Sequence, residues 1–433
     1  MRVRLQSKEA EINKIFQIPG DKSISHRALI IGALGKGGYN IENFPQSLDC
    51  LSTVECMKSL GVKIELNGSN VRVISPGYSN FIKFPELLNA NNSGTTARLL
   101  SGLAVGCGVE TFIDGDESLR SRPMDRVIVP LKLMGANIES SKGSLPISLK
   151  NTQLLKGIEY KMPIDSAQVK SCILIAGFMA EGETKVIENN YTRDHTERMF
   201  KALGCNIDIN GKIIKIKNSA IETKNMYIPG DISSAAFLIA CALLSEKASI
   251  KLENMLLNER RRKYLDVLRQ MGADIEYKVT NIVNYEEIGY ITAKSSSLNG
   301  ITIQREDIPN VIDEIPILSV LAAFSNGITV MEGIGELKHK ESNRIKAIAE
   351  NLINCGIDIE HTENFIKISG YNNKIKKQLN INPYNDHRIA LAFAALSVRN
   401  LGETIIDNWE CTEISFPNSL EYFKEFANIL THL

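Results

Sequence analysis

One short phrase recurs five times along the chain and constrains the fold more than any other feature of the sequence. An apolar residue and a glycine are followed by a short alternating segment that ends on an acidic residue, and the copies begin at Leu60, Met134, Leu203, Met271 and Cys355. Each copy follows a segment with helical periodicity, and glycine accepts the left-handed conformation in which helices commonly end. The phrase therefore predicts five joints in which a helix ends at a glycine and a strand follows.

A second pattern fills the intervals between these joints. It consists of an apolar helical segment, a glycine or polar turn, and a short apolar strand. Its six copies pair residues 28–34 with 40–43, 97–105 with 111–114, 169–179 with 184–188, 235–244 with 248–253, 315–324 with 328–332 and 389–398 with 403–407. Taken together, the two patterns predict six helix–strand–helix–strand units of about 70 residues, a period typical of repeated supersecondary structure.

The two halves of the chain also repeat each other. The phrase Ile-Pro-Gly-Asp at residues 18–21 recurs at residues 228–231, each time before serines and a helix. A chain of 433 residues also exceeds the roughly 250–300 residues that one core supports. We therefore predict an α/β protein with two similar domains, one of residues 20–229 and the other of residues 1–19 and 230–433, with hinges near 15–20 and 226–231. The alternative is a single long α/β domain in which the repetition of this phrase is coincidental.

Composition narrows the class of protein. The 50 basic residues balance the 50 acidic ones, so the net charge indicates neither a nucleic-acid partner nor a membrane partner. No segment approaches the ~20 apolar residues of a membrane span, and the first residues do not resemble a signal peptide. The 8 cysteines are dispersed without a Cys-x-x-Cys pair. We expect a cytoplasmic protein whose cysteines are reduced and buried.

Four expected helices begin with an unusual density of cations and amides. These first turns lie at residues 22–27, 92–98, 166–170 and 385–388. The free N–H groups and the dipole at a helix N-terminus favour an anion, and cations at that end are disfavoured unless an anion binds there. The alternative for each is a capped helix with a surface cation. Four such turns at equivalent places in the repeats favour binding of anionic ligands.

Further charged residues lie in loops. Cations occur in the segments 120–123, 192–197 and 340–344, and the densest basic run, at residues 260–263, is interpreted mainly as a solvated helix face. Asp313 and Glu341 are candidates for acid–base chemistry. Asp313 has the alternative role of a helix N-cap, and Glu341 that of an ion-pair partner of Lys340 or Arg344.

Several common catalytic motifs are missing from the sequence. There is no Walker A loop, no Gly-x-Gly-x-x-Gly after a strand and no Gly-x-Ser-x-Gly elbow. The remaining interpretation is a transferase or isomerase that works without a cofactor on small, heavily anionic molecules.

Five segments resemble the signatures of the 5-enolpyruvylshikimate-3-phosphate synthase family. They are PGDKSISHRA at 19–28, NSGTTAR at 92–98, DEIP at 313–316, KESNR at 340–344 and NDHR at 385–388. The resemblance covers essentially the whole chain in order. It implies two domains, each of three βαβαββ units with the helices inside, an inside-out α/β barrel. It also implies transfer of the enolpyruvyl group of phosphoenolpyruvate to the 5-hydroxyl of shikimate 3-phosphate, with release of phosphate and without metal or organic cofactor.

The resemblance also assigns roles to residues. Shikimate 3-phosphate would be held by Lys22, Ser23, Arg27, Ser166, Ala167, Gln168, Arg193, Asp313 and Lys340. Phosphoenolpyruvate would be held by Lys22, Gly94, Arg122, Gln168, Arg344 and Arg388. Asp313 would take the proton of the 5-hydroxyl, while Glu341 and Lys22 are the candidates for protonating the methylene carbon and assisting phosphate departure. The resemblance further implies inhibition by glyphosate, and we expect a monomer.

Three positions depart from the family pattern. Ala167 stands where many members carry a second serine, Arg193 lies where others offer a serine and a tyrosine, and Ile414 stands where some members place a lysine toward the second substrate. Two alternatives share the resemblance. One is the related enolpyruvyl transferase for UDP-N-acetylglucosamine, which carries a reactive cysteine in a loop that here, at 117–123, has none. The other is a non-catalytic module that binds phosphorylated metabolites.

Overall fold

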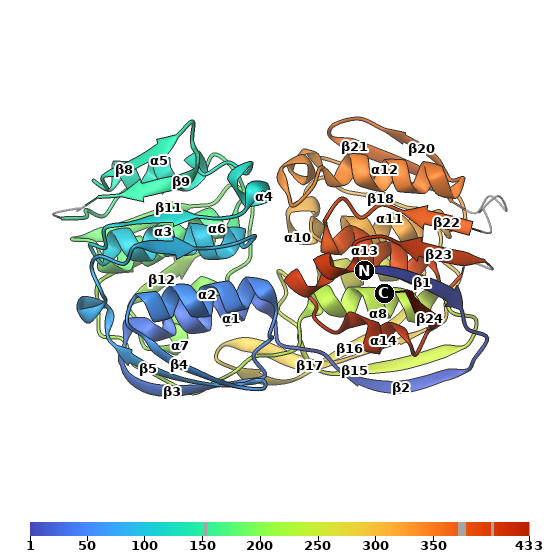
Figure 1. Cartoon of the computed structure of the whole chain (residues 1–433), viewed down its shortest axis with the longest axis horizontal. Coiled ribbons are helices and arrows are strands. Elements are labelled where there is room, and N and C mark those ends of the chain that lie inside the picture. The colour runs from blue at the N-terminus through green and yellow to red at the C-terminus, as the bar shows by residue number, and fades with distance from the viewer. Residues whose placement is uncertain (151–153, 371–377, 400–401, 433) are drawn as a thin grey trace. The chain divides into compact units, whose positions relative to one another are not determined.

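The computed structural model describes residues 1–150, 154–370, 378–399 and 402–432 (Figure 1). The chain divides into two compact units. One consists of Gly20–Pro229 with Ile282–Glu286, and the other of Met1–Pro19, Gly230–Asn281 and Glu287–Leu433. We call them the inserted unit and the flanking unit, because the first interrupts the second in sequence. The segment Ile282–Glu286 belongs to the inserted unit, whereas the sequence analysis places it with the C-terminal residues.

Within the described residues, the two units contain six four-stranded sheets with one common topology. Each sheet has two parallel strands at one edge, a third strand antiparallel to them, and a fourth beside the third. In three of the sheets, formed by residues 87–149, 159–217 and 302–369, the elements follow one another in the expected βαβαββ order. In the other three sheets, one strand comes from a distant part of the sequence.

The inserted unit contains three of these sheets. In sheet order their strands are β14 (Met226–Tyr227), β3 (Lys36–Glu42), β5 (Asn70–Pro76) and β4 (Lys63–Asn67); β6 (Leu87–Asn89), β7 (Thr111–Asp114), β9 (Ser144–Leu149) and β8 (Ile138–Ser141); and β10 (Glu159–Lys161), β11 (Glu183–Ile187), β13 (Ile213–Lys217) and β12 (Ile207–Asn210). Its helices are α1 (Lys22–Ile30), η1 (Gly32–Leu34), α2 (Leu48–Ser59), η2 (Tyr78–Asn80), α3 (Gly94–Gly106), α4 (Glu117–Arg120), α5 (Asp125–Leu133), α6 (Ala167–Met179) and α7 (His195–Ala202).

The flanking unit contains the other three sheets. In sheet order their strands are β2 (Ile12–Gln17), β15 (Ala248–Leu256), β17 (Glu286–Lys294) and β16 (Asp274–Val283); β18 (Thr302–Ile303), β19 (Ile328–Glu332), β21 (Phe365–Ser369) and β20 (Asp358–His361); and β22 (Gln378–Ile381), β23 (Glu403–Ile406), β1 (Arg2–Ser7) and β24 (Ala427–His432). Its helices are α8 (Ile232–Leu244), α9 (Lys263–Gln270), α10 (Ile308–Val311), α11 (Ile315–Ala323), η3 (Gly335–His339), α12 (Arg344–Cys355), α13 (His387–Leu396), η4 (Trp409–Ile414) and α14 (Ser419–Phe423).

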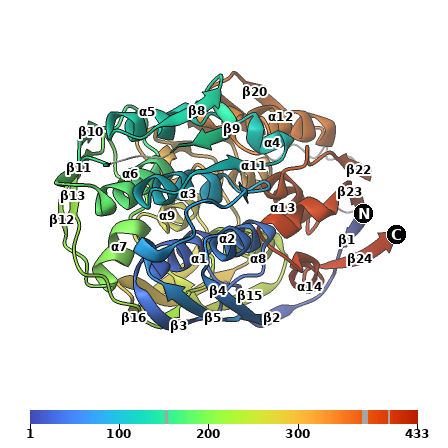
Figure 2. The same cartoon turned by 60° about the vertical axis from the view of Figure 1, so that its left-hand side comes forward.

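Three sheets are completed by strands that are remote in sequence. The strand β2 pairs in parallel with β15, so that Ile12 lies opposite Ala248. The strand β14 pairs in parallel with β3, so that Met226 lies opposite Ile41. The strand β1 lies between β23 and β24, with Val3 opposite Ile406 and Thr431. The first and last strands are therefore neighbours in one sheet (Figure 2).

The five glycine joints are confirmed. The glycines of the repeated phrase all have positive φ, at +91°, +99°, +80°, +94° and +89° for Gly61, Gly135, Gly204, Gly272 and Gly356. Each follows a helix and precedes a strand. Only glycine adopts this conformation without steric cost, which explains why the phrase keeps it.

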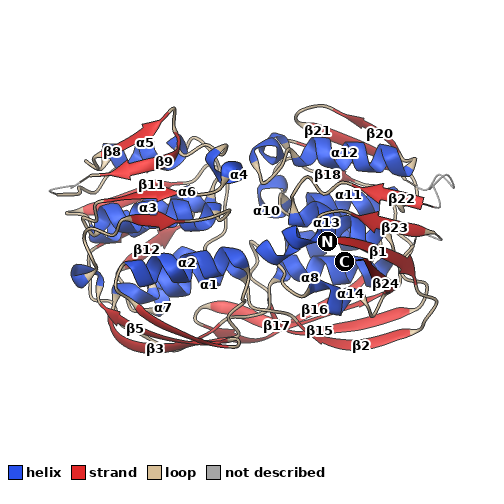
Figure 3. Ribbon diagram, viewed as in Figure 1, coloured by secondary structure: helices blue, strands red, loops and turns tan. Residues whose placement is uncertain are grey.

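The inner helices of each unit are buried almost all round, with the strands along the outside of the unit (Figure 3). All 13 residues of α8, all 9 of α11 and all 10 of α13 are buried. In the inserted unit, α3 and α6 pack so closely at Gly102 that an added Cβ would lie 2.3 Å from the carbonyl oxygen of Cys172. All eight cysteines are free and buried, as predicted.

None of the helices in the described part of the chain is long and apolar enough to cross a membrane. The described residues also hold no group of three or more His, Cys, Asp or Glu side chains placed to bind a metal ion.

Two glycine substitutions separate backbone strain from helix packing. We expect Gly204→Ala to lower the free energy of unfolding by about 1–2 kcal/mol, because its Cβ would meet only Glu222 Cδ at 4.0 Å and the cost is that of the left-handed conformation alone. Gly102→Ala meets the Cys172 backbone and should cost roughly 3 kcal/mol or more. Urea unfolding followed by circular dichroism measures both, and a Gly102→Ala variant as stable as Gly204→Ala would contradict the close contact.

Candidate active site

The first helix of the inserted unit begins with the cation Lys22, as the sequence analysis expects, but Arg27 lies in the last turn of this helix. Asp21 caps α1 by accepting a hydrogen bond from the Ile24 N–H at 3.0 Å. Lys22 is the first helical residue, and its Nζ lies 2.6 Å from a carboxylate oxygen of Asp49 on α2. The Asp49 carboxylate therefore holds the Lys22 ammonium at the opening of the helix, and sequence reasoning did not identify Asp49.

Arg27 is a buried cation surrounded by neutral acceptors. Its side chain donates to Thr196 Oγ1 and to Ser171 Oγ, both at 2.7 Å, and to the Ser23 carbonyl oxygen at 2.8 Å. Only 3% of Arg27 is exposed, and no carboxylate oxygen in the described residues lies within ion-pair distance of it.

The electrostatics of Arg27 agree with this geometry. Burial lowers the pKa of Arg27 to about 10, with Glu197 and Asp21 acting against this shift and Arg193 adding to it. A buried guanidinium without an ion-pair partner is costly unless an anion arrives to share its charge. Arg27 is therefore a candidate anion-binding residue of the inserted unit.

The N-termini of α3 and α6 are joined by side-chain hydrogen bonds. Ser93 and Ser166 cap these two helices. Gln168 accepts from Arg98 Nη1 at 2.5 Å and donates to Thr95 Oγ1 at 2.9 Å. The structure thus brings Gln168 to the start of α3. Arg98, to which the sequence analysis assigned no role, is the residue that orients the Gln168 amide.

Gly94, the first residue of α3, lies against two guanidinium groups. A Cβ at this position would be 3.1 Å from Arg98 Nη1 and 3.4 Å from Arg122 Nη1. Arg122 is itself buried and donates to Asn92 Oδ1 at 2.8 Å. Because Gly94 has no side chain, a ligand can approach the helix N-terminus and both cations together.

Lys170, the cation of the first turn at residues 166–170, does not face an external anion as the sequence analysis expected, because two carboxylates of the chain pair with it. Its fully buried Nζ lies 2.9 Å from Glu188 Oε1 and 2.6 Å from Glu197 Oε1. Glu188 also accepts from the Thr192 N–H at 3.0 Å, which ties down the segment that carries Arg193. A lysine inside the apolar run of α6 was the available signal, because such a residue is buried only when it is paired.

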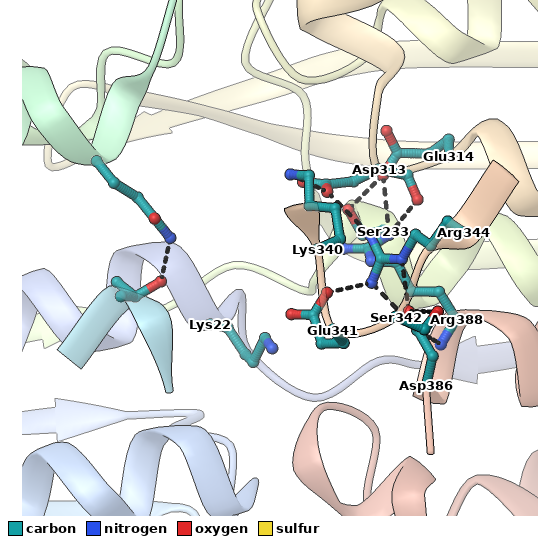
Figure 4. A network of polar contacts seen from close by, with 12 residues as sticks. Lys22, Ser233, Asp313, Glu314, Lys340, Glu341, Ser342, Arg344, Asp386 and Arg388 are labelled. Atoms are coloured by element: carbon teal, nitrogen blue, oxygen red, sulfur yellow. Dashed lines mark hydrogen bonds and ion pairs between the residues drawn. The ribbon is translucent and has the colours of Figure 1, made fainter. Parts of the chain in front are cut away.

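In the flanking unit, Arg344 is the centre of the polar network (Figure 4). Its Nε and Nη2 donate to Asp386 at 2.8 and 3.1 Å, Nη2 lies 2.6 Å from Glu341, and Nη1 lies 3.5 Å from Asp313. Burial lowers the pKa of Arg344, but Asp386, Glu341 and Asp313 outweigh burial and raise it. Arg344 therefore holds three carboxylates in place.

The two acid–base candidates both belong to this network. Asp313 Oδ1 lies 3.1 Å from Lys340 Nζ. It does not cap α11, because the N-cap residue is Glu314 and makes no side-chain cap bond. Glu341 occurs in the ion pair with Arg344 that the sequence analysis gave as its alternative role.

Arg388 is anchored at only one of its nitrogens. Its Nη1 donates to the Asp313 carbonyl oxygen at 2.7 Å and lies 3.5 Å from Glu314 Oε1. Within the described ranges, no acceptor pairs with its Nε or Nη2. One edge of the guanidinium is thus open to a planar or tetrahedral anion.

The interpretation of residues 260–263 as a solvated helix face is wrong. The helix α9 begins at Lys263, so the three arginines precede it. Arg261 is only 4% exposed and donates from Nη2 to Ser233 Oγ at 2.9 Å. A run of basic residues in the sequence indicates that most of them are exposed to solvent, but it does not show which side chain is buried.

The three departures from the family pattern have these places. Ala167 is the first residue of α6, next to the cap Ser166. Arg193 is half-buried before α7 and close enough to Arg27 to act on its pKa. Ile414 is the last residue of η4.

Comparison with known proteins shows which family the chain belongs to. The family model of EPSP synthase (3-phosphoshikimate 1-carboxyvinyltransferase) matches residues 6–423. A 3-phosphoshikimate 1-carboxyvinyltransferase of Clostridium tetani is 54% identical over 97% of this chain and 96% of its own length. One of Caldicellulosiruptor saccharolyticus is 44% identical over 97% of this chain and 98% of its own length.

Solved structures of related proteins have the same fold as this chain. The EPSP synthase of Acinetobacter baumannii superposes with a TM-score of 0.87 at 37% identity over 100% of both chains. The enolpyruvyl transferase NikO of Streptomyces tendae shares the fold, with a TM-score of 0.77 at 14% identity over 99% of this chain and 98% of its own.

The chain therefore has the fold of the enolpyruvyl transferases, which both of these solved structures share. Within that class, the chain belongs to the EPSP synthase (3-phosphoshikimate 1-carboxyvinyltransferase) family. Its activity is that of a 3-phosphoshikimate 1-carboxyvinyltransferase, a step of the shikimate pathway toward aromatic amino acids.

A buried histidine beside the cluster makes stability depend on pH. His26 contacts Thr53 Oγ1 through Nδ1 at 2.7 Å, and burial, with Lys22 and Arg27, lowers its pKa well below 6.5. Below pH 6.5, His26 therefore binds a proton in the unfolded chain but not in the folded chain. The free energy of unfolding consequently decreases as the pH falls below 6.5.

We expect the free energy of unfolding to fall on going from about pH 7.5 to about pH 5.5, by up to ~1.4 kcal/mol per pH unit from this residue. Urea unfolding at each pH should show a smaller fall for His26→Gln. The exposed His361 provides the control, because His361→Gln should leave the pH dependence unchanged. Equal pH dependence in wild type and His26→Gln would contradict this account.

Proposed function

We propose that the enolpyruvyl transfer is carried out by the residues around Arg27 and Gly94 in the inserted unit and by the Arg344 network of the flanking unit. We further propose that Arg27 anchors the phosphate group of shikimate 3-phosphate. The observation that supports this role most directly is the burial of Arg27 among two hydroxyls and a carbonyl, without a carboxylate partner in the described chain. A phosphate supplies the missing charge and accepts hydrogen bonds from a guanidinium.

The other groups proposed for shikimate 3-phosphate surround Arg27 in the inserted unit or belong to the Arg344 network. Ser166 already accepts a hydrogen bond as the cap of α6, and its hydroxyl proton remains available to a ligand oxygen. The full proposed set is Lys22, Ser23, Arg27, Ser166, Ala167, Gln168, Arg193, Asp313 and Lys340.

For phosphoenolpyruvate, we propose Lys22, Gly94, Arg122, Gln168, Arg344 and Arg388. The open guanidinium edge of Arg388 and the space beside Gly94 support this set most strongly. Arg344 differs, because each of its donor nitrogens already faces a carboxylate. Its contact with the substrate therefore requires exchange of one of these carboxylates for the substrate anion.

The proposed chemistry follows from these positions. Asp313 accepts the proton of the 5-hydroxyl as the hydroxyl oxygen attacks C2 of phosphoenolpyruvate, and a proton is delivered to the methylene carbon by Glu341 or Lys22. The resulting methyl group then returns one proton to the residue that delivered it, and the bond between C2 and the phosphate oxygen breaks, so that the double bond is restored and phosphate leaves. The two substrates bring about five or six negative charges, which preorganised cations stabilise throughout.

The proposal also covers the cellular location and the oligomeric state of the enzyme. We place the enzyme in the cytoplasm, because its eight cysteines are all free thiols. We expect it to work as a monomer.

The direct test is phosphate release by the purified protein with shikimate 3-phosphate and phosphoenolpyruvate. Release should require both substrates, and omission of either should abolish it. Release from phosphoenolpyruvate alone would contradict transfer as the reaction.

Asp313→Asn tests the base. The amide oxygen still accepts from Lys340 and Arg344, so the KM of each substrate should change little, whereas kcat should fall by about 10²–10⁴-fold because an amide takes no proton. Asp307→Asn is the matched control and should keep kcat, because Asp307 is the residue before α10 and its carboxylate pairs with Lys263 at 3.0 Å. If Asp313→Asn retains a tenth or more of wild-type kcat, Asp313 is not the base.

Gly94→Ala tests the second-substrate subsite. The added methyl presses on Arg98 and Arg122, so the KM of phosphoenolpyruvate should rise by about threefold to tenfold while that of shikimate 3-phosphate changes less. Glyphosate, which is longer, should lose more affinity than phosphoenolpyruvate. Steady-state kinetics give the ratio of the glyphosate inhibition constant to KM, and an unchanged ratio would remove Gly94 from this subsite.

A further inference from the structure

Three buried polar residues of the flanking unit have no part in the proposed chemistry. Ser233 lies in the first turn of α8, Arg261 lies in the loop before α9, and Glu314 is the N-cap residue of α11. They are 5%, 4% and 3% exposed. Burial of two charged groups is costly unless each is held in a defined arrangement.

The hydrogen bonds among them have one possible direction. Arg261 Nη2 lies 2.9 Å from Ser233 Oγ, and a guanidinium only donates. The Ser233 hydroxyl therefore accepts from Arg261 and donates its single proton to Glu314 Oε1, at 2.5 Å. Glu314 Oε1 is thus fixed as an acceptor.

The same Glu314 oxygen lies 3.5 Å from Arg388 Nη1, which also donates to the Asp313 carbonyl oxygen at 2.7 Å (Figure 4). The Asp313 carbonyl oxygen and the Glu314 carboxylate oxygen thus both contact Nη1 of the planar Arg388 guanidinium. With that nitrogen fixed, the plane of the guanidinium and the direction of its open edge are set.

We propose that Ser233, Arg261 and Glu314 are positioning residues for Arg388, and through it for the anion of the second substrate. Glu314 holds the guanidinium, and Ser233 with Arg261 holds Glu314. The inference rests on the proposed role of Arg388 in binding phosphoenolpyruvate. It also explains why Arg261 turns inward while Arg262 stacks over the Tyr277 ring, 5.1 Å from its centroid.

The charges around Glu314 support the same assignment. Its carboxylate lies between two buried cations, since Arg388 contacts it directly and Arg261 contacts it through Ser233. Arg261 also lies 3.9 Å from Asp231, the cap of α8. Loss of the Glu314 charge therefore weakens the hold on Arg388 without removing the Asp313 carbonyl contact.

The experiment is a double-mutant cycle on KM. Glu314→Gln should raise the KM of phosphoenolpyruvate about tenfold, the loss expected when one charge-assisted hydrogen bond is weakened. The KM of shikimate 3-phosphate and kcat should stay within about threefold. Ser233→Ala should change the same constant in the same direction, and it provides a second variant if Glu314→Gln folds poorly by thermal unfolding. Arg262→Ala is the matched control and should leave all constants near wild type.

Arg388→Ala separates the possible failures. If it raises the KM of phosphoenolpyruvate and Glu314→Gln adds nothing in that background, Glu314 acts through Arg388, as proposed. If Glu314→Gln raises KM equally in both backgrounds, or leaves it unchanged in the wild type, the positioning role is overturned. If Arg388→Ala itself leaves this KM unchanged, the proposed role of Arg388 fails, and the inference fails with it.

Discussion

The burial of the inner helices on every side is the constraint on which the rest of the structure depends. A helix such as α8 or α13, with no exposed residue, offers no polar face along its length. Its unpaired N–H groups and its polar side chains are confined to its ends. The first turns are therefore where caps, cations and hydroxyls gather, and the site follows from the packing of the helices.

The two units differ in how the charge of their central buried arginine is compensated. In the inserted unit, Arg27 is surrounded by hydroxyl and carbonyl oxygens. In the flanking unit, Arg344 is neutralised by Asp386, Glu341 and Asp313. A cation without a carboxylate partner binds an external anion strongly, whereas a cation with three such partners organises them. This difference supports the proposed role of Arg27 as an anchor for a substrate anion, whereas Arg344 holds three carboxylates in place, although the sequence analysis assigned substrate binding to both.

Local rules made much of the fold predictable. The glycine joints were found because a left-handed helix end selects glycine at a fixed place, and Gly204 or Gly356 shows this without knowledge of any partner. The first turns were found because the buried helices concentrate their polar residues there. The surroundings of Lys170 and Arg261 were predicted wrongly, and Asp49 was not identified, because each is defined by a partner on another element that sequence spacing does not encode. The assignment of Ile282–Glu286 failed for the same reason.

The remote closing strands dictate an order of folding during synthesis. Apart from Ile282–Glu286, the inserted unit is complete once β14 has left the ribosome. The strand β1 is made first, yet its partners β23 and β24 follow about 400 residues later, so its edges stay unpaired for most of translation. At a common elongation rate of about 5–20 residues per second, that interval lasts roughly 20–80 seconds. The flanking unit is therefore the half that most needs protection from aggregation in the cell.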